Sequence, residues 1–440
     1  TVNKPDLVDI FALTTNAKEP DKYLLDGRWR SFREKTIKLK VKLFGFLPWQ
    51  VKRKALYTEH GPAIETPHGI YAIRYAGMGE VKQIEQWLAM NKATNFEEWL
   101  AALAQHTFAS FNFVYSDKDG NIAFIHNSMT PVRIPGYNWH NYLPGDKSSL
   151  IWDSYISFEK LPMVINPSSG YLISANQSPF FVTSDKDNPD RKNYSNEDGF
   201  PTRMTNRAVR GLELLSELDK IDERTFSAIK HDKKYSKNSR AYKYLEKAML
   251  ADLGDLNTQK HEIYANAQTI LKKWDLSTDK NNRGAALGTC IIGAEWLAEQ
   301  QGENPPDPSG ELKRCTDLLL DKIGRIDPKW GEVNRHIRGE INVALGGGPD
   351  TLRAIYGLGL EEKGYLTNIA GDGLYYLVSW DKDKKQNVLG IHQFGSATLD
   401  ENSPHYADQA LDFANEILHD PLFDANKRQQ KLDRRYRPGQ

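Results

Sequence analysis

The amino-acid sequence predicts an α+β protein, an αββα-type sandwich of two antiparallel sheets with a helical insertion. Strand-like segments dominate both ends of the 440-residue chain, and helical periodicity dominates its middle. Short turns, as in hairpins, join neighbouring strands in two places. We therefore expect residues 1–204 to form the first part of a sheet core, 205–345 a mostly helical insertion, and 346–440 the return strands and a C-terminal strap that complete the core.

The composition allows a large core and does not point to a charged partner. Hydrophobic residues make up 39% of the chain and aromatic residues 11%, while Lys+Arg and Asp+Glu both number 58. This overall balance gives no reason to expect nucleic acid or an anionic membrane as a partner. The longest apolar runs fall well short of the roughly 18 residues that a membrane span needs. A small or apolar ligand is the favoured partner, and no organic cofactor is expected.

Neither the two cysteines nor the glycine-rich run of this chain predicts a cofactor site. Only Cys290 and Cys315 occur, so the chain has neither a thiolate metal cluster nor a disulfide framework. The two cysteines either form one disulfide or stay as buried thiols. The glycine-rich run at 346–350 lacks a following Gly-Lys-Ser/Thr and carries an acid, so it is not a phosphate loop.

Alternating apolar residues predict the strands. Residues 36–43 place Ile, Leu, Val and Leu on one face and three lysines on the other, which predicts a half-buried antiparallel strand with a solvated lysine face. No aromatic residues interleave with these lysines, so they do not indicate a nucleic-acid site. Further strands, the last four of them paired as hairpins, are predicted at 8–12, 69–75, 111–115, 121–125, 373–380 and 387–394.

Helical periodicity is confined to one place in the first part and is frequent in the second. A helix at 80–90 is followed by another, which Thr94 and Glu97 open with a capping-box pattern. Residues 131–153 lack periodicity and predict a long ordered loop. Apolar residues three and four apart predict further helices at 205–218, 222–231, 239–251, 257–274, 283–300, 310–322 and 407–417.

The stretch at 165–179 combines a turn with a short apolar run. Its Asn-Pro-Ser-Ser-Gly turn launches a predicted strand at 171–175, which delivers Asn176 to its end. An amide side chain at the mouth of a rigid strand is well placed to donate a hydrogen bond to developing negative charge, as in an oxyanion hole. The alternative is that Asn176 only caps a turn.

This stretch resembles the penicillin acylase and acyl-homoserine lactone acylase family of N-terminal nucleophile hydrolases. Further matches follow in the family's order along nearly the whole chain: Asp-Leu-Val-Asp-Ile-Phe at 6–11, Asn-Phe-Glu-Glu-Trp at 95–99, the hairpin at 112–122, Arg203, and Pro-His-Tyr-Ala-Asp-Gln at 404–409. The resemblance is to the large subunit without its N-terminal segment. It implies the αββα fold of these hydrolases.

The resemblance also implies catalytic residues. Family members use the side chain of a first residue as nucleophile and that residue's own amine as base. Thr1 and Val2 match an inner position several dozen residues after the nucleophile, so the nucleophile is expected outside this chain. The backbone N–H of Val2 and the amide of Asn176 would form the oxyanion hole, and Arg203 would orient Asn176 and the nucleophile's amine. Without the resemblance, Arg203 is an arginine at a helix entrance that pairs with a surface acid.

A calcium site is implied near the start of the chain. The resemblance gives its ligands as Asp6, the carbonyl of Val8, and Asp9. These groups suit calcium, because hard cations bind carboxylate and carbonyl oxygens. Asp187 or Asp185 would add a further ligand, and another would come from outside the chain. The alternative for Asp6 and Asp9 is a pair of solvated acids at the end of a strand.

The chain is therefore expected to belong to an amidohydrolase that cleaves an N-acylated small molecule, such as a penicillin-like amide or an N-acyl-homoserine lactone, through an acyl-enzyme. Trp87, which would otherwise be a core residue, and Phe111 match positions that line the acyl pocket. The expected partners are this substrate, a companion small subunit and the upstream segment that bears the nucleophile. Family members are usually exported, so a periplasmic or secreted enzyme is expected, although the chain shows no signal peptide and does not begin with methionine. The alternative is a non-catalytic fragment or binding protein of the same fold.

Overall fold

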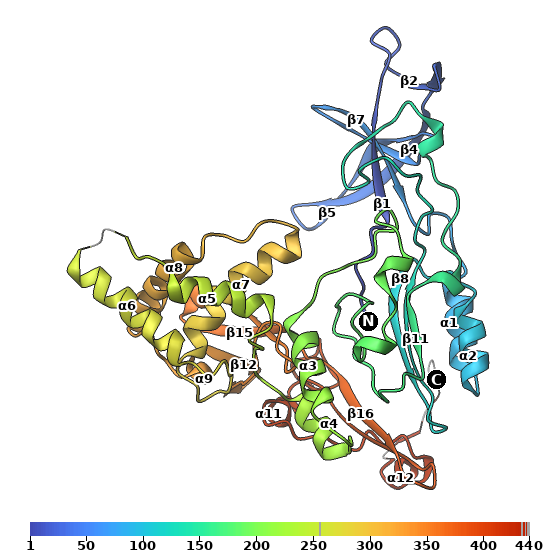
Figure 1. The fold of residues 1–440 in the computed structure, drawn as a ribbon. Helices are drawn as coiled ribbons and strands as arrows, with labels where there is room; N and C mark the ends of the chain where they lie inside the picture. The colour runs from blue at the N-terminus through green and yellow to red at the C-terminus, as the bar shows by residue number, and fades with distance from the viewer. Residues whose placement is uncertain (255–256, 433, 436, 438–440) are drawn as a thin grey trace. The chain divides into compact units, whose positions relative to one another are not determined.

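The computed structural model describes residues 1–254, 257–432, 434–435 and 437, and the chain divides into two compact units (Figure 1). The first unit is Thr1–Arg203 and the second is Met204–Gln440. Each unit has hydrophobic clusters of its own. The further division expected at 345, between a helical insertion and return strands, stays a prediction.

The first unit contains a six-stranded sheet in the order β10-β1-β7-β6-β5-β4, antiparallel except for the β1–β10 pair. Side chains alternate along a strand, so Phe11 and Leu13 of β1 enter a core that also holds Trp152. A small hairpin of β2 and β3 contributes to the same core. The strands are β1 (Val8–Leu13), β2 (Lys22–Leu25), β3 (Arg28–Ser31), β4 (Arg33–Leu43), β5 (Leu47–Tyr57), β6 (Pro62–Thr66), β7 (Gly69–Tyr75) and β10 (Leu143–Pro144).

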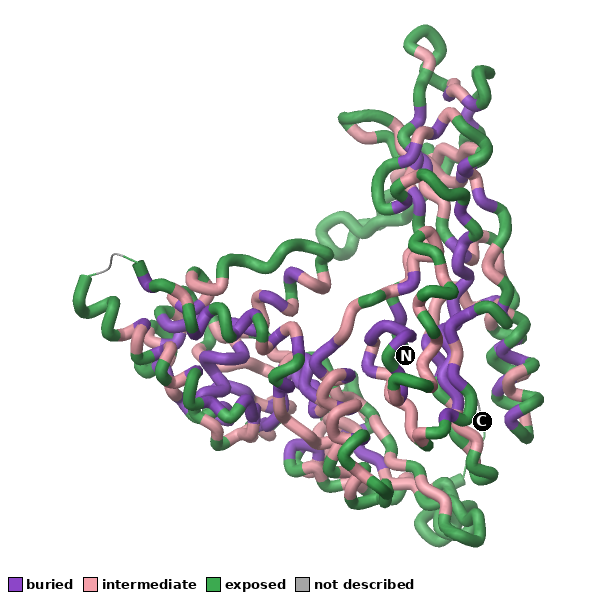
Figure 2. Tube along the Cα trace, viewed as in Figure 1, coloured by how far each residue is buried: buried purple, intermediate pink, exposed green. Residues whose placement is uncertain are grey.

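The β4–β5 hairpin differs from the sequence prediction in its burial. Residues 36–43 form a strand, as predicted, but all of β4 is exposed rather than half-buried. β4 is an edge of the sheet, and β5 joins β6 through only the pairs Leu56–Ala63 and Tyr57–Pro62. The rest of the hairpin therefore extends past the sheet as a two-stranded ribbon with both faces exposed (Figures 1 and 2).

A three-stranded antiparallel sheet in the order β11-β9-β8 packs with two helices around another core of the first unit. β8 and β9 are the hairpin that the sequence predicts. The N-cap of α2 is Asn95, whose side chain accepts a hydrogen bond from Glu98 N, so the predicted Thr94–Glu97 box is wrong by one residue. These elements are α1 (Gln83–Lys92), α2 (Phe96–Leu103), β8 (Ser110–Ser116), β9 (Ile122–Ser128) and β11 (Met163–Ile165).

The strand predicted at 171–175 does not form, and this part of the prediction is wrong. One backbone hydrogen bond, from Ile173 N to Val182 O, ties the segment to a neighbour as in a ladder. The Gln177 side chain takes the place of a second strand. Its Nε2 donates to the carbonyls of Ile173 and Phe181 at 2.9 and 3.0 Å, and its Oε1 accepts from Ala175 N at 2.6 Å. Because a side-chain amide satisfies these backbone groups, the segment needs no sheet ladder.

Helices form the first half of the second unit and lie close to their predicted ranges. Their starts have a local cause, since Thr205, Ser239 and Asn257 each accept a hydrogen bond from a backbone N–H of the first turn. The helices are α3 (Asn206–Ser216), α4 (Glu223–Lys230), α5 (Arg240–Leu250), α6 (Thr258–Lys273), α7 (Ala285–Gln301), α8 (Pro308–Ile323) and α9 (Trp330–Val333).

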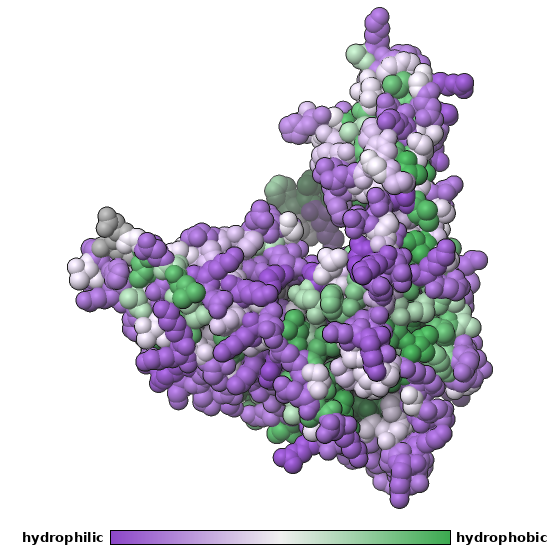
Figure 3. Space-filling view, viewed as in Figure 1, coloured by the Kyte–Doolittle hydropathy of each residue, from purple (hydrophilic) through white to green (hydrophobic). Residues whose placement is uncertain are grey.

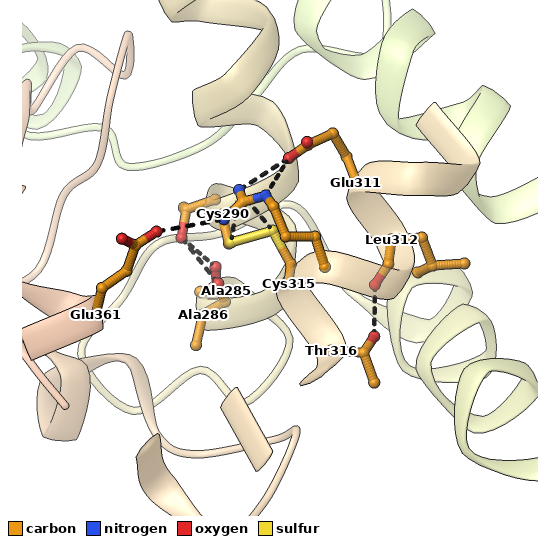
Figure 4. The surroundings of a disulfide bond; sticks show 10 residues. Ala285, Ala286, Cys290, Glu311, Leu312, Cys315, Thr316 and Glu361 are labelled. Carbon is orange, nitrogen blue, oxygen red and sulfur yellow. Dashed lines mark hydrogen bonds and ion pairs between the residues drawn. A yellow bond between two sulfur atoms is a disulfide. The ribbon is translucent and has the colours of Figure 1, made fainter. Parts of the chain in front are cut away.

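A disulfide joins α7 and α8 inside this helical core. It links Cys290 to Cys315, which is one of the two states that the sequence allows. Arg314 lies beside the bond, with its Nη2 3.6 and 3.4 Å from the two sulfurs, and forms an ion pair with Glu311 (Figure 4). The disulfide therefore covalently fixes two helices whose buried faces share one hydrophobic cluster.

The rest of the second unit contains a four-stranded sheet in the order β13-β12-β15-β14 and the predicted β16–β17 hairpin. The glycine-rich run has a structural role, because a Cβ on Gly347 would lie 2.4 Å from Arg353 O and the Asp350 carboxylate accepts from Asn206 N at the start of α3. In the part of the chain that the structure describes, no helix is long and apolar enough to cross a membrane. These elements are β12 (Asn334–Arg338), β13 (Ile341–Ala344), β14 (Ile355–Leu358), α10 (Leu360–Lys363), β15 (Leu366–Gly371), β16 (Tyr375–Trp380), β17 (Gln386–Ile391), α11 (Ala410–Ala414) and α12 (Ala425–Gln430).

Candidate active site

The first three residues of the chain lie along β8 of the first unit. The backbone nitrogen of Thr1 donates to Asn112 O at 2.6 Å, and Asn112 N donates to Thr1 O at 2.7 Å. The buried Asn3 side chain donates to Asn127 O at 2.9 Å. These bonds hold the backbone of Val2 between two anchored neighbours, while its side chain is exposed. Among the described residues, the N–H of Val2 has no hydrogen-bond partner.

Asn176 reaches this segment from a loop of the same unit. Its φ of +62° is left-handed, a conformation that asparagine accepts more readily than most residues. Its Nδ2 donates to Thr1 Oγ1 at 3.0 Å and to Val2 O at 2.8 Å. The loop is held at its base by a hydrogen bond from Ser178 N to Arg203 O at 2.8 Å. The structure therefore brings the three predicted catalytic residues, Val2, Asn176 and Arg203, into one region.

This arrangement brings two N–H donors to the same short segment. One is the Nδ2 of Asn176, and the other is the Val2 N–H, which is unpaired within the described residues. A substrate oxygen that replaced Thr1 Oγ1 as acceptor would meet a donor whose direction is already fixed by the surrounding hydrogen bonds. Fixed donors of this kind stabilise an oxyanion because they need no reorganisation during the reaction.

A buried histidine that the sequence reasoning did not single out supports the same strand. His126 of β9 is fully buried, and its Nδ1 lies 2.9 Å from Oδ1 of Asn112, the residue that pairs with Thr1. Burial lowers the pKa of His126 to about 3, so the ring is neutral at physiological pH. The sequence signal for this residue is the polar His-Asn-Ser run that ends an otherwise apolar strand.

Trp87 and Phe111, the predicted pocket residues, meet in an aromatic cluster of the first unit. Their ring centroids are 6.4 Å apart, and the ring of Phe108 lies 5.3 Å from that of Trp87. Trp87 is 44% exposed and lines an apolar depression of about 380 Å³ on α1. Phe111 directly precedes Asn112 on β8, so one strand connects the aromatic cluster to the segment that carries Val2. Such an apolar surface is suited to an acyl group.

Asp6 and Asp9, two of the predicted calcium ligands, bind an arginine that the sequence reasoning missed. The side chain of Arg133 is completely buried, with Nη1 3.1 Å from Asp6 Oδ2 and Nε 3.0 Å from Asp9 Oδ2. Trp152 Nε1 also donates to Asp9 Oδ2 at 2.7 Å. Burial raises the pKa of Asp9, and the charge of Arg133 opposes this effect. Arg133 belongs to the aperiodic loop at 131–153, where no sequence pattern distinguishes a buried arginine from an exposed one.

The structure does not gather the predicted calcium ligands around one point. The Asp187 carboxylate binds serines and not the Asp6–Asp9 pair. It accepts hydrogen bonds from Ser168, Ser169 and Ser184. Within the described ranges, no three His, Cys, Asp or Glu side chains are placed to hold a metal ion. Calcium binds about six to eight oxygens, whereas Arg133 already supplies positive charge to Asp6 and Asp9. As they stand, Asp6, Val8, Asp9 and Asp187 do not fit the ion, and calcium binding in an assembled enzyme stays a prediction.

A solved structure with the same architecture defines the class of fold. Thermostable penicillin G acylase from Alcaligenes faecalis matches with a TM-score of 0.66 and 17% identity, over 99% of this chain and 87% of that one. The fold is therefore that of the N-terminal nucleophile hydrolases, as predicted. The penicillin amidase family model matches residues 1–430, and the chain belongs to this family.

Two curated relatives are similar in sequence. Penicillin G acylase from Escherichia coli is 34% identical over 181 residues, which are 40% of this chain and 20% of the relative. Acyl-homoserine lactone acylase PvdQ from Pseudomonas fluorescens (strain Pf-5) is 22% identical over 478 residues, with 94% of this chain and 58% of the relative covered. The chain therefore spans less than two thirds of the length of either relative.

Proposed function

We propose that this chain carries the oxyanion hole and acyl pocket of an amidohydrolase that acts on N-acylated small molecules, such as penicillin-like amides or N-acyl-homoserine lactones. The observation that carries the proposal is the contact of the Asn176 amide with the Thr1–Val2 segment, 2.8 Å from Val2 O. Membership of the penicillin amidase family supports hydrolysis of acylated substrates in general. The names of the two relatives support the two substrate classes.

In the proposed reaction, the nucleophile is the first residue of a segment outside these 440 residues, and its own amine is the base. The nucleophile attacks the acyl carbon, the substrate nitrogen leaves with a proton from that amine, and water then releases the acyl group. The Val2 N–H and Asn176 Nδ2 bind the carbonyl oxygen as it becomes an oxyanion. Arg203 orients Asn176 and the nucleophile's amine, and the Trp87–Phe111 cluster holds the acyl chain.

The proposed enzyme also needs a companion small subunit and works outside the cytoplasm. Membership of the penicillin amidase family supports the companion, because this family is processed into subunits. The Cys290–Cys315 disulfide supports a periplasmic or secreted location, because cytosolic reductants keep most thiols reduced.

The test uses the native protein, purified together with the polypeptides that accompany it. Its hydrolysis of a phenylacetyl amide and of a long-chain acyl-homoserine lactone is measured, and phenylmethylsulfonyl fluoride is then used to label the nucleophile. We expect hydrolysis of at least one substrate, and a covalent label on the first residue of the upstream segment, whether that segment is joined to Thr1 or is an accompanying polypeptide. Intact mass and N-terminal sequencing locate the label.

Two results would overturn parts of this proposal. A label on Thr1 would assign the nucleophile to this chain. If the native assembly hydrolyses neither substrate and takes no label, the chain is a non-catalytic fragment or binding protein of the same fold.

A further inference from the structure

One face of the β4–β5 hairpin is mainly apolar between Ile37 and the turn, and cationic side chains interrupt it nearer the sheet. Residues opposite each other in an antiparallel pair share a face, and the register pairs Leu39 with Val51 and Val41 with Trp49. Their side chains are at least partly exposed, with Trp49 at 56%. The apolar part of this face also includes Ile37, Leu43 and Leu47, which are likewise exposed. Arg53 lies opposite Ile37 on the same face, and the next pair toward the sheet is Lys35 with Ala55.

The opposite face of the same hairpin is cationic. The register pairs Lys38 with Lys52 and Thr36 with Lys54, and Lys40 and Lys42 continue the row. Residues 33–57 contain eight lysines and arginines but one glutamate, an excess that the neutral total of the whole chain conceals. Within the described residues, no ion pair or hydrogen bond engages the side chains of four of these lysines, Lys38, Lys40, Lys42 and Lys52.

The two faces meet at an aromatic tip. Phe44 and Phe46 flank Gly45 in the turn, and these phenylalanine side chains are 87% and 76% exposed. Apolar side chains gather at this end of the ribbon (Figure 3). Exposed apolar surface of this kind marks a site of interaction with a partner or a membrane, because leaving it in water costs free energy.

We propose that the β4–β5 hairpin docks the protein on an anionic phospholipid surface. The Phe44–Phe46 tip enters the headgroup region, Trp49 lies at the interface, and the lysine rows bind lipid phosphates. This is a peripheral contact, and the hairpin does not span the bilayer.

Charge and shape favour a lipid surface over a protein partner. A protein that covered the apolar face of this thin ribbon would leave the unpaired lysines of the other face unused. A lipid headgroup layer engages both, because it surrounds the tip and offers anionic groups along either side. Lysines on the β4 edge also keep a second copy from pairing there, since like charges would oppose each other.

The experiment measures binding to vesicles by flotation, for this chain and for the native assembly that contains it. Vesicles are either phosphatidylcholine alone or a mixture with 30% phosphatidylglycerol. The tip variant is Phe44→Ser with Phe46→Ser, and the charge variant is Lys40→Glu with Lys42→Glu. Matched controls change exposed residues of the second unit, Leu399→Ser for the tip and Lys237→Glu with Lys382→Glu for the charge.

We expect binding to the phosphatidylglycerol vesicles that weakens as salt rises, and little binding to phosphatidylcholine alone. The tip variant should bind at least tenfold more weakly and the charge variant on the order of 100-fold more weakly, while the controls stay within about twofold. Unchanged melting temperatures would show that all variants fold.

Each of the following results would overturn the proposal. The wild type binds the two vesicle types equally or not at all, or the hairpin variants bind as well as their controls. Binding by the isolated chain but not by the native assembly would show that a companion polypeptide covers the hairpin. If the wild type is a dimer on gel filtration and the tip variant is a monomer, the hairpin binds a second copy of the chain and not a lipid surface.

Discussion

Asn176 is constrained both by the contacts of its side chain and by the conformation of its backbone. Its amide contacts Thr1 Oγ1 and Val2 O, and its backbone has a φ of +62°. A substitution there therefore removes a hydrogen-bond donor and also changes the cost of a left-handed backbone. The two effects are separable, because glycine accepts the backbone conformation without supplying the amide.

We predict that Asn176→Ala and Asn176→Gly each lower the turnover of the complete enzyme by about 10²- to 10³-fold, with little change in KM. One oxyanion donor contributes roughly 2.7 to 4 kcal/mol to the transition state and less to the ground state. Turnover and melting temperature are measured together for both variants. If Asn176 were only a turn cap, Asn176→Gly would retain nearly full turnover and Asn176→Ala would mainly lose stability.

His126 makes the stability of the first unit dependent on pH. Burial lowers its pKa to about 3 in the folded chain, whereas an unfolded histidine takes up a proton near pH 6.5. Between these values the unfolded chain binds the additional proton, so the free energy of unfolding falls as pH drops below about 6.5. His126→Gln removes the titrating group and keeps an amide that can reach Asn112 Oδ1.

We predict that the loss of unfolding free energy between pH 7 and pH 5 is smaller in His126→Gln than in the wild type, by about 2 kcal/mol. Urea unfolding at several pH values measures it. The control is His68→Gln, which changes an exposed histidine and should leave the pH profile unchanged. Identical profiles for His126→Gln and the wild type would show that His126 is accessible to protons in the folded chain.

At the scale of elements, Arg133 connects the start of β1 to the aperiodic loop at 131–153. The two carboxylates that it binds, Asp6 and Asp9, flank the point where the Thr1–Val2 segment becomes β1. The same elements bury Trp152 against Asp9. The guanidinium of Arg133 therefore neutralises the two carboxylates that the calcium prediction gives to a metal ion.

We predict that Arg133→Met lowers the free energy of unfolding by about 3 to 5 kcal/mol, because it leaves Asp9 buried without its cation. Arg30→Met is the control, since its pair with Glu59 is exposed and contributes at most about 1 kcal/mol. A calcium chelator should leave the melting temperature of this chain unchanged. A lower melting temperature that added calcium restores would instead support the predicted ligands Asp6, Val8, Asp9 and Asp187.

At the scale of the whole molecule, each hydrophobic cluster belongs to one unit. The clusters around Phe11, Phe113 and Val182 lie in Thr1–Arg203, and those around Leu245 and Phe413 lie in Met204–Gln440. The stabilising cross-links divide in the same way, with Arg133 in the first unit and the disulfide in the second. We expect cores that are separate in this way to unfold as separate cooperative units.

We predict two transitions in scanning calorimetry. Cys290→Ala with Cys315→Ala should lower only the second unit's transition, by about 6 °C or more, because opening a 25-residue loop costs about 3 kcal/mol. Arg133→Met serves as the reciprocal control and should move only the other transition. A single transition that both variants shift would show that the two units unfold together.

The sequence by itself determined the local elements and the family. Helices α3–α8 and the β8–β9 hairpin lie near their predicted positions, because caps, turns and apolar periodicity act between neighbouring residues. Only the tertiary structure decided that Arg133 meets Asp6 and Asp9, that Gln177 replaces a strand, and that β4 is exposed along its whole length. These outcomes depend on which distant segments become neighbours, and burial and charge pairing follow from that proximity rather than from any pattern along the chain.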